Sequence, residues 1–340
     1  MKNISYIFIC LSLLLCISCQ HTDDPKSRSV GFDITQSSDT THITVYSPWQ
    51  TGKVMAKYMI TEPFERVVCT SSTHIGFIHE LGLTDKVVGA CRPERIYNLT
   101  PEQRSRIIDI GDDIRPNMEA ILLAKPDAVI ISTYAEGDYI PQQIESLGIP
   151  VFYCNEWIEQ TPLARAEWIR FFGACFGCID RADSIYNTVS KEYQAMIKST
   201  GGTSIMSGMS FRGTWYVPTG STFMGRFFKD AGAQYHYADH TSATSLPLTM
   251  EQAIQDLAEA DVWIGCDART MSELKAIDDK HTWFKAYQNK RVYNFLKRSL
   301  PSGANDFWES GVVHPERILH DLQLVLKGET NDLYYTLPLL

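Results

Sequence analysis

The sequence predicts an α/β protein in which two Rossmann-like lobes with mostly parallel sheets are joined by a long helical connector, with a ligand cleft between the lobes. Three observations lead to this prediction. Apolar strands alternate with amphipathic helices along most of the chain, which is typical of parallel, helix-covered sheets. About forty consecutive residues near the middle contain no strand pattern. A short sequence motif that places a glutamate in the first turn of a helix occurs twice, 132 residues apart.

Residues 1–18 have the pattern of a targeting signal. Lys2 supplies a positive charge, residues 4–17 are almost wholly apolar, and a serine precedes Cys19. An apolar core of about 15 residues is short for a membrane span, which indicates a signal peptide. The pattern resembles a bacterial lipoprotein signal, and this resemblance implies that Cys19 is acylated; an unlipidated secretory signal is the alternative. Residues 19–42 are mostly polar and are predicted to be the lipidated N-terminus and a flexible tether.

The N-terminal α/β lobe is predicted to span residues 43–160. Its short apolar runs are typical of buried strands, and several of its helices end at a glycine, the residue that most readily closes a helix. The predicted strands are 66–71, 85–90, 128–132 and 150–154, and the predicted helices are 72–81, the helix that begins near Glu119, and 139–147.

Residues 161–200 are predicted to be the helical connector, kinked near Gly173 and Gly177. Residues 201–340 then repeat the alternation and are predicted to be the C-terminal α/β lobe. The predicted strands are 204–209, 214–217, 261–265 and 291–295, and the predicted helices are 221–231, the helix that begins near Glu251, 271–276 and 315–326. A single helical connector predicts only modest closure of the lobes.

The composition limits the classes of partner. The 340 residues exceed what one hydrophobic core usually spans, so two domains are expected. The net charge is −9, and no basic stretch opposes it. Nucleic acid and anionic membrane surfaces are therefore poor candidates for direct binding.

The repeated sequence motif places Glu119 shortly after Asn117 and Glu251 shortly after Thr249. Asn and Thr are good N-cap residues, so both carboxylates fall in a first helical turn, where the helix dipole stabilises a negative charge. Helix capping alone would explain either glutamate. The occurrence of the pair indicates two lobes that are built alike.

Several segments in a fixed order resemble the periplasmic substrate-binding lipoproteins of iron-chelate and cobalamin ABC importers. These segments are Arg66 to Gly89, Asn117-Met118-Glu119 with Lys125-Pro126-Asp127, the helical connector, Thr249-Met250-Glu251, and Asn305 to Gly311. The resemblance covers about residues 60–328 and implies the class III binding-protein fold, with its helical backbone. It also implies that Glu119 and Glu251 each contact arginines on one subunit of a membrane permease dimer.

Candidate ligand-binding residues follow the strands, because ligands of open α/β sheets lie outside the carboxyl ends of the strands. Arginine offers a fixed set of donors to carboxylate or catecholate oxygens, and Trp and Tyr rings offer apolar faces. The predicted ligand-binding residues are Arg92, Tyr134, Trp157, Arg212, Trp215, Tyr216, Arg298 and Trp308. Core packing is the alternative for each aromatic residue, and a surface ion pair is the alternative for each arginine. Together they suit a large planar or chelated anion.

Two other classes of function have weaker support. His236 and His240 are four residues apart beside Asp239, as in a helical metal site, but they follow Gly232 in a loop-like segment without a third His or Cys at a telling distance. No metal site is predicted, and binding of a free metal ion is a minor alternative. The chain lacks the G-x-S-x-G, H-E-x-x-H, Walker A and G-x-G-x-x-G motifs. We therefore predict no catalytic residues and no resident cofactor, with a secreted hydrolase as the alternative.

These inferences combine into one functional expectation. We expect a monomeric, lipid-anchored protein of the bacterial cell envelope that captures an iron chelate, either a siderophore or a haem-like ligand, and delivers it to an ABC permease dimer. A cobalamin-binding protein of the same fold is the first alternative. The number of arginines in the candidate loops favours a siderophore over cobalamin.

Overall fold

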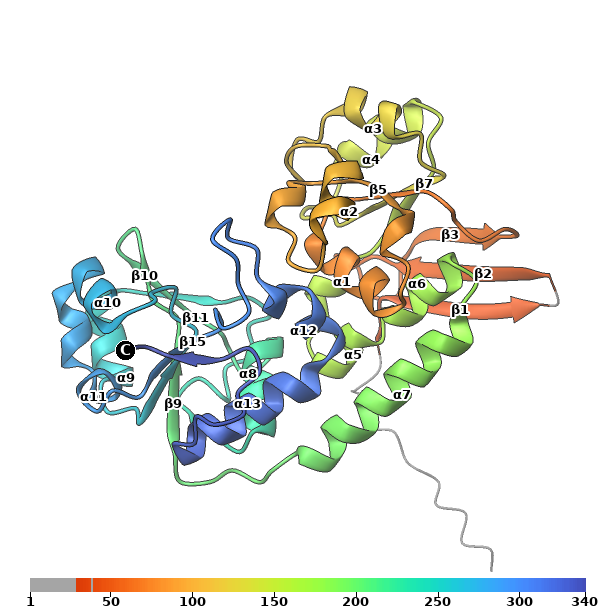
Figure 1. The fold of residues 1–340 in the computed structure, drawn as a ribbon. Helices are drawn as coiled ribbons and strands as arrows, with labels where there is room; N and C mark the ends of the chain where they lie inside the picture. The colour runs from red at the N-terminus through yellow and green to blue at the C-terminus, as the bar shows by residue number, and fades with distance from the viewer. Residues whose placement is uncertain (1–28, 38) are drawn as a thin grey trace, which may run out of the picture.

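The computed structural model describes residues 29–37 and 39–340, and over these residues it forms two α/β lobes that are linked by three consecutive helices (Figure 1). Each lobe has a five-stranded central sheet and a three-stranded sheet beside it. The predicted fold class is confirmed, because the two central sheets are mainly parallel and are covered by helices. The proposed signal peptide and Cys19 lie outside the described residues.

The central sheet of the N-terminal lobe is entirely parallel, with the order β6-β5-β4-β7-β8. Its strands are β4 Val67–Cys69, β5 Val87–Ala90, β6 Ile108–Asp109, β7 Ala128–Ile131 and β8 Val151–Tyr153. Successive strands are added on one side of β4 and then on the other, so the loops after β4 and β7 diverge and leave space at the carboxyl edge of the sheet. Along β4, Val67 and Cys69 pack into one core and Val68 into another, as the alternation of a strand requires.

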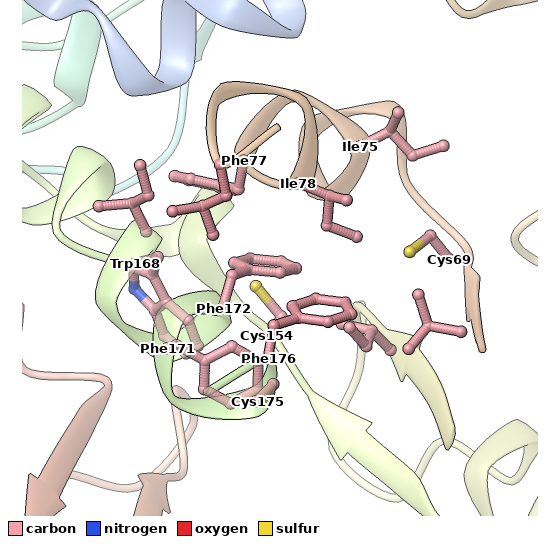
Figure 2. Close-up of a cluster of buried hydrophobic side chains, with 14 of the residues drawn as sticks. Cys69, Ile75, Phe77, Ile78, Cys154, Trp168, Phe171, Phe172, Cys175 and Phe176 are labelled. Atoms are coloured by element: carbon pink, nitrogen blue, oxygen red, sulfur yellow. The ribbon is translucent and has the colours of Figure 1, made fainter. Parts of the chain in front are cut away.

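One face of this sheet packs on α1 (Ser72–Glu80) and the connector helix α6 (Ile169–Cys175). Figure 2 shows the aromatic side chains of residues 168–176 gathered close to Phe77 and Ile78 of α1. Phe77 stacks on Phe172 with ring centroids 5.0 Å apart. Helices α2 Pro101–Arg106, α3 Met118–Ala124 and α4 Ile140–Ser146 complete the lobe.

The predicted helical connector is present as α5 (Pro162–Ala166), α6 and α7 (Ile179–Met196). The break between α6 and α7 contains Gly177, whose φ is +66°. The connector was also predicted to kink near Gly173, but this residue has a different role. It lies inside α6, where a Cβ would come within 2.6 Å of the Ala182 side chain on α7, so its small size allows the two helices to approach closely.

The C-terminal lobe has the sheet order β12-β9-β14-β15-β16, in which the last strand is antiparallel. Its strands are β9 Ser204–Ser207, β12 Gln234–Tyr235, β14 Val262–Ile264, β15 Val292–Asn294 and β16 Leu337–Pro338; beside them lie β10 Ser210–Phe211, β11 Thr214–Val217 and β13 Leu246–Leu248. Its helices are α8 Phe223–Asp230, α9 Met250–Leu257, α10 Met271–Ile277, α11 Lys285–Gln288, α12 Ser310–Val313 and α13 Pro315–Lys327. Val312 and Val313 of α12 pack into the core of the N-terminal lobe, so the two lobes share a boundary beside the connector.

An additional antiparallel sheet precedes the first lobe and was not predicted (Figure 1). It consists of β1 (Phe32–Ser37), β2 (Thr40–Tyr46) and β3 (Val54–Ile60), with β2 in the middle. The prediction of a flexible tether up to residue 42 is therefore wrong for residues 32–37 and 40–42. The physical reason is burial of apolar side chains on one face, where Phe32 lies 4.7 Å from Trp168 between ring centroids.

Candidate functional site

Three of the predicted ligand-binding residues lie in loops at the carboxyl edge of the N-terminal sheet. Arg92 follows β5, Tyr134 follows β7 and Trp157 follows β8. The rings of Tyr134 and Trp157 are 5.6 Å apart between centroids. The Tyr134 hydroxyl donates to Asp113 Oδ2 at 2.8 Å, and burial together with this bond raises the pKa of Tyr134. The hydroxyl therefore stays protonated, and the two partly exposed rings form an aromatic surface.

Carboxylates surround the arginine of this edge. Arg92 forms an ion pair with Asp112, and its backbone N–H donates to Asp109 Oδ1 at 3.2 Å. The Ile114 N–H, Asp113 and the Arg92 guanidinium hold the pKa of Asp112 below its ordinary value. The charge of Arg92 is thus already compensated, and the loop after β6 makes this edge acidic.

The second arginine, Arg298, lies where the two lobes meet. Its Nε donates to Asp306 Oδ2 at 2.6 Å, and Asp306 is fully buried. Its guanidinium lies 4.6 Å from the centroid of the Tyr334 ring and 5.3 Å from that of Tyr97, which belongs to the N-terminal lobe. Burial opposes the charge, but Asp306 raises the pKa of Arg298 above its ordinary value. Arg298 is therefore a fixed cation between aromatic rings from both lobes.

Backbone hydrogen bonds also cross this boundary. The Glu309 carboxylate accepts from the Tyr97 N–H at 2.6 Å and from the Asn98 N–H at 2.9 Å, and Asn98 Nδ2 donates to Asp306 Oδ1 at 2.6 Å. Burial raises the pKa of Glu309 to about 7. The segment that carries Arg298, Asp306 and Glu309 is consequently tied to the loop after β5.

A histidine forms a further link between the lobes. His314 Nε2 lies 3.0 Å from Glu80 Oε2 at the end of α1, and its Nδ1 lies 2.8 Å from Glu316 Oε1 on α13. Burial disfavours the charged imidazole, but the two carboxylates outweigh it and raise the pKa of His314 to about 9. The imidazolium therefore bridges a carboxylate of each lobe at neutral pH.

We expect the free energy of unfolding to decrease as pH rises through about 9. The folded protein holds the His314 proton more tightly than the unfolded chain, whose histidine titrates near 6.5, so the stabilisation is complete below pH 6.5 and is lost as pH rises through about 9. The loss should be about 2–3 kcal/mol. Urea unfolding between pH 6 and 9.5 measures it. The decrease should be smaller in His314→Gln than in His320→Gln, because other buried groups with raised pKa, such as Glu309, titrate in both variants; equal pH slopes in the two variants would contradict the assignment.

The remaining predicted residues of the C-terminal lobe lie in separate places. Arg212 occupies the turn between β10 and β11 with φ +52°, and its guanidinium covers the exposed ring of Phe211 at 5.1 Å. Tyr216 of β11 is half-exposed. Trp308 is also half-exposed and lines a crevice with Arg165 of α5 and other side chains. Within the described residues, no hydrogen bond, ion pair or ring contact joins Arg212 or Tyr216 to Tyr134 or Trp157.

The assignment of Trp215 to the ligand is corrected by its burial. Its side chain is fully buried, its Nε1 donates to the Ser207 carbonyl at 3.1 Å, and its ring packs 5.3 Å from both Trp263 and Phe284. Because neighbouring residues of a strand face opposite sides, Tyr216 is exposed and Trp215 points into the core. Trp215 therefore stabilises the lobe and has no surface to offer a ligand.

One group of potential metal ligands is buried beneath the aromatic surface. His74, Cys154 and Glu156 place one ligand atom each within 4.8 Å of the others. Glu156 Oε1, however, lies 3.3 Å from Arg165 Nη2, and Ser132 Oγ lies 3.1 Å from His74 Nε2. Burial lowers the pKa of His74, so the imidazole is neutral. The carboxylate already has a cationic partner, and we interpret the group as a structural polar cluster.

The histidine pair that the sequence suggested for a free metal ion does not form a three-ligand site among the described residues. His236 Nε2 lies 3.9 Å from Asp256 Oδ2 and is half-exposed, whereas His240 Nδ1 accepts from the Ser242 N–H at 3.3 Å. The segment is a turn after β12. The two imidazoles therefore have different local partners.

Glu119 and Glu251 occupy equivalent positions in the two lobes. Asn117 caps α3 and accepts from the Glu119 N–H at 3.0 Å, and Thr249 caps α9 and accepts from the Gln252 N–H at 3.2 Å. Both glutamates are exposed in the first turn. Glu251 lies 3.3 Å from Lys280, whereas Glu119 has no ion pair within the described part of the chain.

Sequence reasoning missed Trp49, which joins the aromatic surface of the first lobe. It lies in the turn between β2 and β3, and its ring centroid is 6.4 Å from that of Trp157. The signal that could have found it is a turn-rich segment around Gly52 between two runs with β-branched residues, which is a hairpin pattern. Within residues 29–37 and 39–340, no helix has the length and apolar character that crossing a membrane requires.

Comparison with known proteins identifies the family. A sequence profile described as periplasmic binding protein matches residues 67–298. An uncharacterized lipoprotein of Methanocaldococcus jannaschii is 23% identical over 289 residues, which are 80% of this chain and 67% of that protein.

Solved structures share the fold at low sequence identity. The apo periplasmic heme-binding protein of Roseiflexus sp. RS-1 has a TM-score of 0.62 at 21% identity, covering 78% of this chain and 98% of its own. From Vibrio cholerae, the periplasmic catecholate-siderophore binding protein has a TM-score of 0.59 at 15% identity (79% and 96% covered), and the periplasmic vitamin B12 binding protein has 0.57 at 15% (78% and 97%). The profile match and the relatives described as lipoproteins support an extracytoplasmic, envelope-associated location. The chain belongs to the periplasmic binding protein family, the solute-binding components of ABC importers.

Proposed function

We propose that this protein is a monomeric, lipid-anchored binding protein that captures a metal chelate between its lobes, either a ferric siderophore or a haem-like tetrapyrrole, and delivers it to an ABC permease dimer. The observation that carries the proposal is the pair of partly exposed rings, Tyr134 and Trp157, at the carboxyl edge of the N-terminal sheet. Ligands of such sheets lie at this edge. Two adjacent aromatic rings offer a large apolar face at little entropic cost, which suits a flat, metal-centred ligand.

The ion pairs of the two arginines limit the charge of the ligand. Arg92 is paired with Asp112, and Arg298 with the buried Asp306. A highly charged anion would have to compete with these carboxylates, whereas a tetrapyrrole with one or two carboxylates would not need to displace them. The same observation favours a corrinoid as the second candidate, because cobalamin needs few cationic partners. These two ion pairs therefore weaken the argument that the number of arginines favours a siderophore over cobalamin.

The decisive experiment is a titration of the purified protein with iron protoporphyrin IX, cyanocobalamin, and ferric catecholate and hydroxamate siderophores. Tryptophan fluorescence gives the signal, since Trp157 and Trp308 are partly exposed, and calorimetry excludes optical artefacts. We expect saturable 1:1 binding of one ligand class in the micromolar range or tighter. A protein that binds none of these ligands would refute the proposal.

We expect Arg92→Gln to weaken an anionic chelate about five- to tenfold and to leave cyanocobalamin unchanged. The guanidinium is half-exposed, so it can bind a carboxylate of the ligand while it stays paired with Asp112. Removing the guanidinium should cost roughly one charge-assisted hydrogen bond to the ligand. The matched control is Arg106→Gln, which removes an exposed arginine of α2 that pairs with Asp85. Equal dissociation constants for Arg92→Gln and Arg106→Gln would remove Arg92 from the ligand site.

Arg298 calls for a different substitution. Alanine at this position would leave the fully buried Asp306 without its cation, so a loss of affinity would be mixed with a loss of structure. Arg298→Lys keeps the charge but removes the planar fork that lies over Tyr334. It is therefore the better probe of a direct contact with the ligand.

The proposed anchor and the proposed docking residues complete this function. Cys19 would carry the lipid, and Glu119 and Glu251 would each meet one permease subunit. Their exposure, the equivalence of their positions and the placement of α3 and α9 in different lobes support this assignment (Figure 1). Two contacts so far apart require the permease to recognise both lobes at once.

A further inference from the structure

The hairpin between β2 and β3 reaches the aromatic surface of the N-terminal lobe. Its turn brings Trp49 to 6.4 Å from Trp157, and Trp157 lies 5.6 Å from Tyr134. Three rings from three separate segments therefore follow one another along the carboxyl edge of the sheet. The hairpin precedes residue 67, where the match to the family profile begins. Trp49 is thus an addition to the part of the chain that defines the family.

The hairpin is fixed to the lobe on its inner side. Tyr58 of β3 stacks on Phe152 of β8 with ring centroids 4.0 Å apart, and its hydroxyl accepts from the Tyr153 N–H at 3.0 Å. A tyrosine held in this way by an aromatic stack and a backbone donor has little freedom. The two strands thereby hold the turn that carries Trp49 against the loops that follow β7 and β8.

The turn is also held at its tip. Ser47 N–H donates to the Lys53 carbonyl at 2.7 Å and closes the turn. Gln50 Nε2 donates to Glu136, in the loop that carries Tyr134, and Lys53 Nζ lies 4.0 Å from the same carboxylate. Because Glu136 and Tyr134 belong to one loop, movement of that loop and movement of the Trp49 turn are coupled.

The indole N–H groups of Trp49 and Trp157 have an unusual environment. Both Nε1 atoms are shielded from solvent and have no acceptor among the described residues. A buried donor without an acceptor is unfavourable, and most buried polar groups in proteins are paired. Two such donors on adjacent rings beside the candidate site indicate an acceptor that binds when the rings separate.

We propose that Trp49 is a specificity-determining residue, which stacks on a flat conjugated ligand together with Trp157 and supplies an indole N–H to an acceptor atom at the rim of that ligand. The inference rests on the proposed function and narrows it to chelates with an extended planar face and peripheral carboxylate or carbonyl groups. Compact chelates of aliphatic hydroxamates lack such a face and gain nothing from the third ring. The hairpin therefore restricts the protein to flat ligands.

The test compares Trp49→Ala and Trp49→Phe with Trp283→Ala, which removes an exposed tryptophan from the C-terminal lobe. Calorimetry measures binding of iron protoporphyrin IX, cyanocobalamin, and ferric catecholate and hydroxamate complexes to each purified protein. Circular dichroism and urea unfolding verify that the variants are folded. We expect Trp49→Ala to weaken a planar ligand about tenfold or more, and Trp283→Ala to stay within about threefold of the original protein. Trp49→Phe keeps an aromatic ring but removes the indole N–H, so it should weaken the ligand by an intermediate factor of about three to ten.

The outcomes separate the inference from the function on which it rests. If the unmodified protein binds a planar ligand and Trp49→Ala binds it equally well, the role of Trp49 is refuted and the proposed function stands. If the unmodified protein binds only the hydroxamate complex, the proposal that it binds an iron chelate stands, and the inference that its ligands are planar is refuted. If it binds no ligand of the panel, both proposals fail.

Discussion

Replacing Glu119 and Glu251 together by lysine is expected to reduce ligand transport on the order of 100-fold, while the dissociation constant of the ligand changes less than about twofold. Under the proposed docking, each reversal would turn an attraction to a permease arginine into a repulsion, and juxtaposed like charges in an interface cost several kcal/mol. Affinity for the ligand should persist because both side chains are exposed at helix N-termini and contact none of the candidate ligand residues.

The two single reversals should differ. A backbone hydrogen bond and then Lys280, 3.3 Å away, lower the pKa of Glu251, and Lys280 compensates part of its charge. Glu119 has no such partner within the described residues. We therefore expect Glu119→Lys alone to have the larger effect on the rate of association with the permease, because a free charge contributes more to steering than a paired one.

A control with the same total charge distinguishes docking from a general change in electrostatics. Glu102 on α2 and Asp180 on α7 are also exposed first-turn carboxylates, so the variant Glu102→Lys/Asp180→Lys carries the same net charge as the docking variant. Uptake is measured in proteoliposomes that contain the cognate permease, with the ligand found by titration. Equal uptake by the two double variants would contradict the docking assignment.

Much of the fold could be predicted because the signals are local. The buried strand Ala128–Ile131 is a run of β-branched and small residues, and α1 ends at Glu80, two residues before Gly82, whose φ is +68°. Such patterns depend on residues that are close in the sequence. The additional N-terminal sheet could not be recognised in this way, since β1 has polar residues such as Thr35 and Gln36 on its exposed positions and gains its stability from Trp168, far along the chain.

The candidate site was harder to predict because it depends on partners that are distant in the sequence. The carboxylate next to Arg92 lies 20 residues away, and the ring above Arg298 comes from the other lobe. The residue types that follow each strand could be read from the sequence. Which of them are paired, and which side of β11 faces the core, are set by tertiary packing, which is why Trp215 was misassigned.

The largest effect on stability is expected from the buried ion pair beneath the aromatic surface. Glu156 and Arg165 are almost fully buried, with 3.3 Å between Oε1 and Nη2, and the pair links the loop after β8 to the connector helix α5. Replacing Glu156 by glutamine leaves the guanidinium in the interior without a carboxylate. We expect a loss of about 3–5 kcal/mol in the free energy of unfolding, because an uncompensated buried charge is strongly destabilising.

A double-mutant cycle tests the cause of that loss. Arg165→Met removes the cation and leaves the carboxylate unpaired, so it should also be costly, whereas the double variant Glu156→Gln/Arg165→Met contains no unpaired charge. We expect the double variant to be more stable than the sum of the two single losses predicts by at least about 2 kcal/mol. Urea unfolding, followed by both fluorescence and circular dichroism, gives the four free energies.

The exposed pair Arg106–Asp85 provides the matched control, because its N···O distance is also 3.3 Å but its side chains are 59% and 74% exposed. Arg106→Met should change the free energy of unfolding by less than about 0.5 kcal/mol, since water replaces the lost partner. The two pairs therefore separate burial from distance as the origin of the cost. Similar losses in the free energy of unfolding for Arg165→Met and Arg106→Met would mean that burial does not determine the cost. A large loss for Glu156→Gln without one for Arg165→Met would instead assign the cost to the other contacts of Glu156, which are His74 and Cys154.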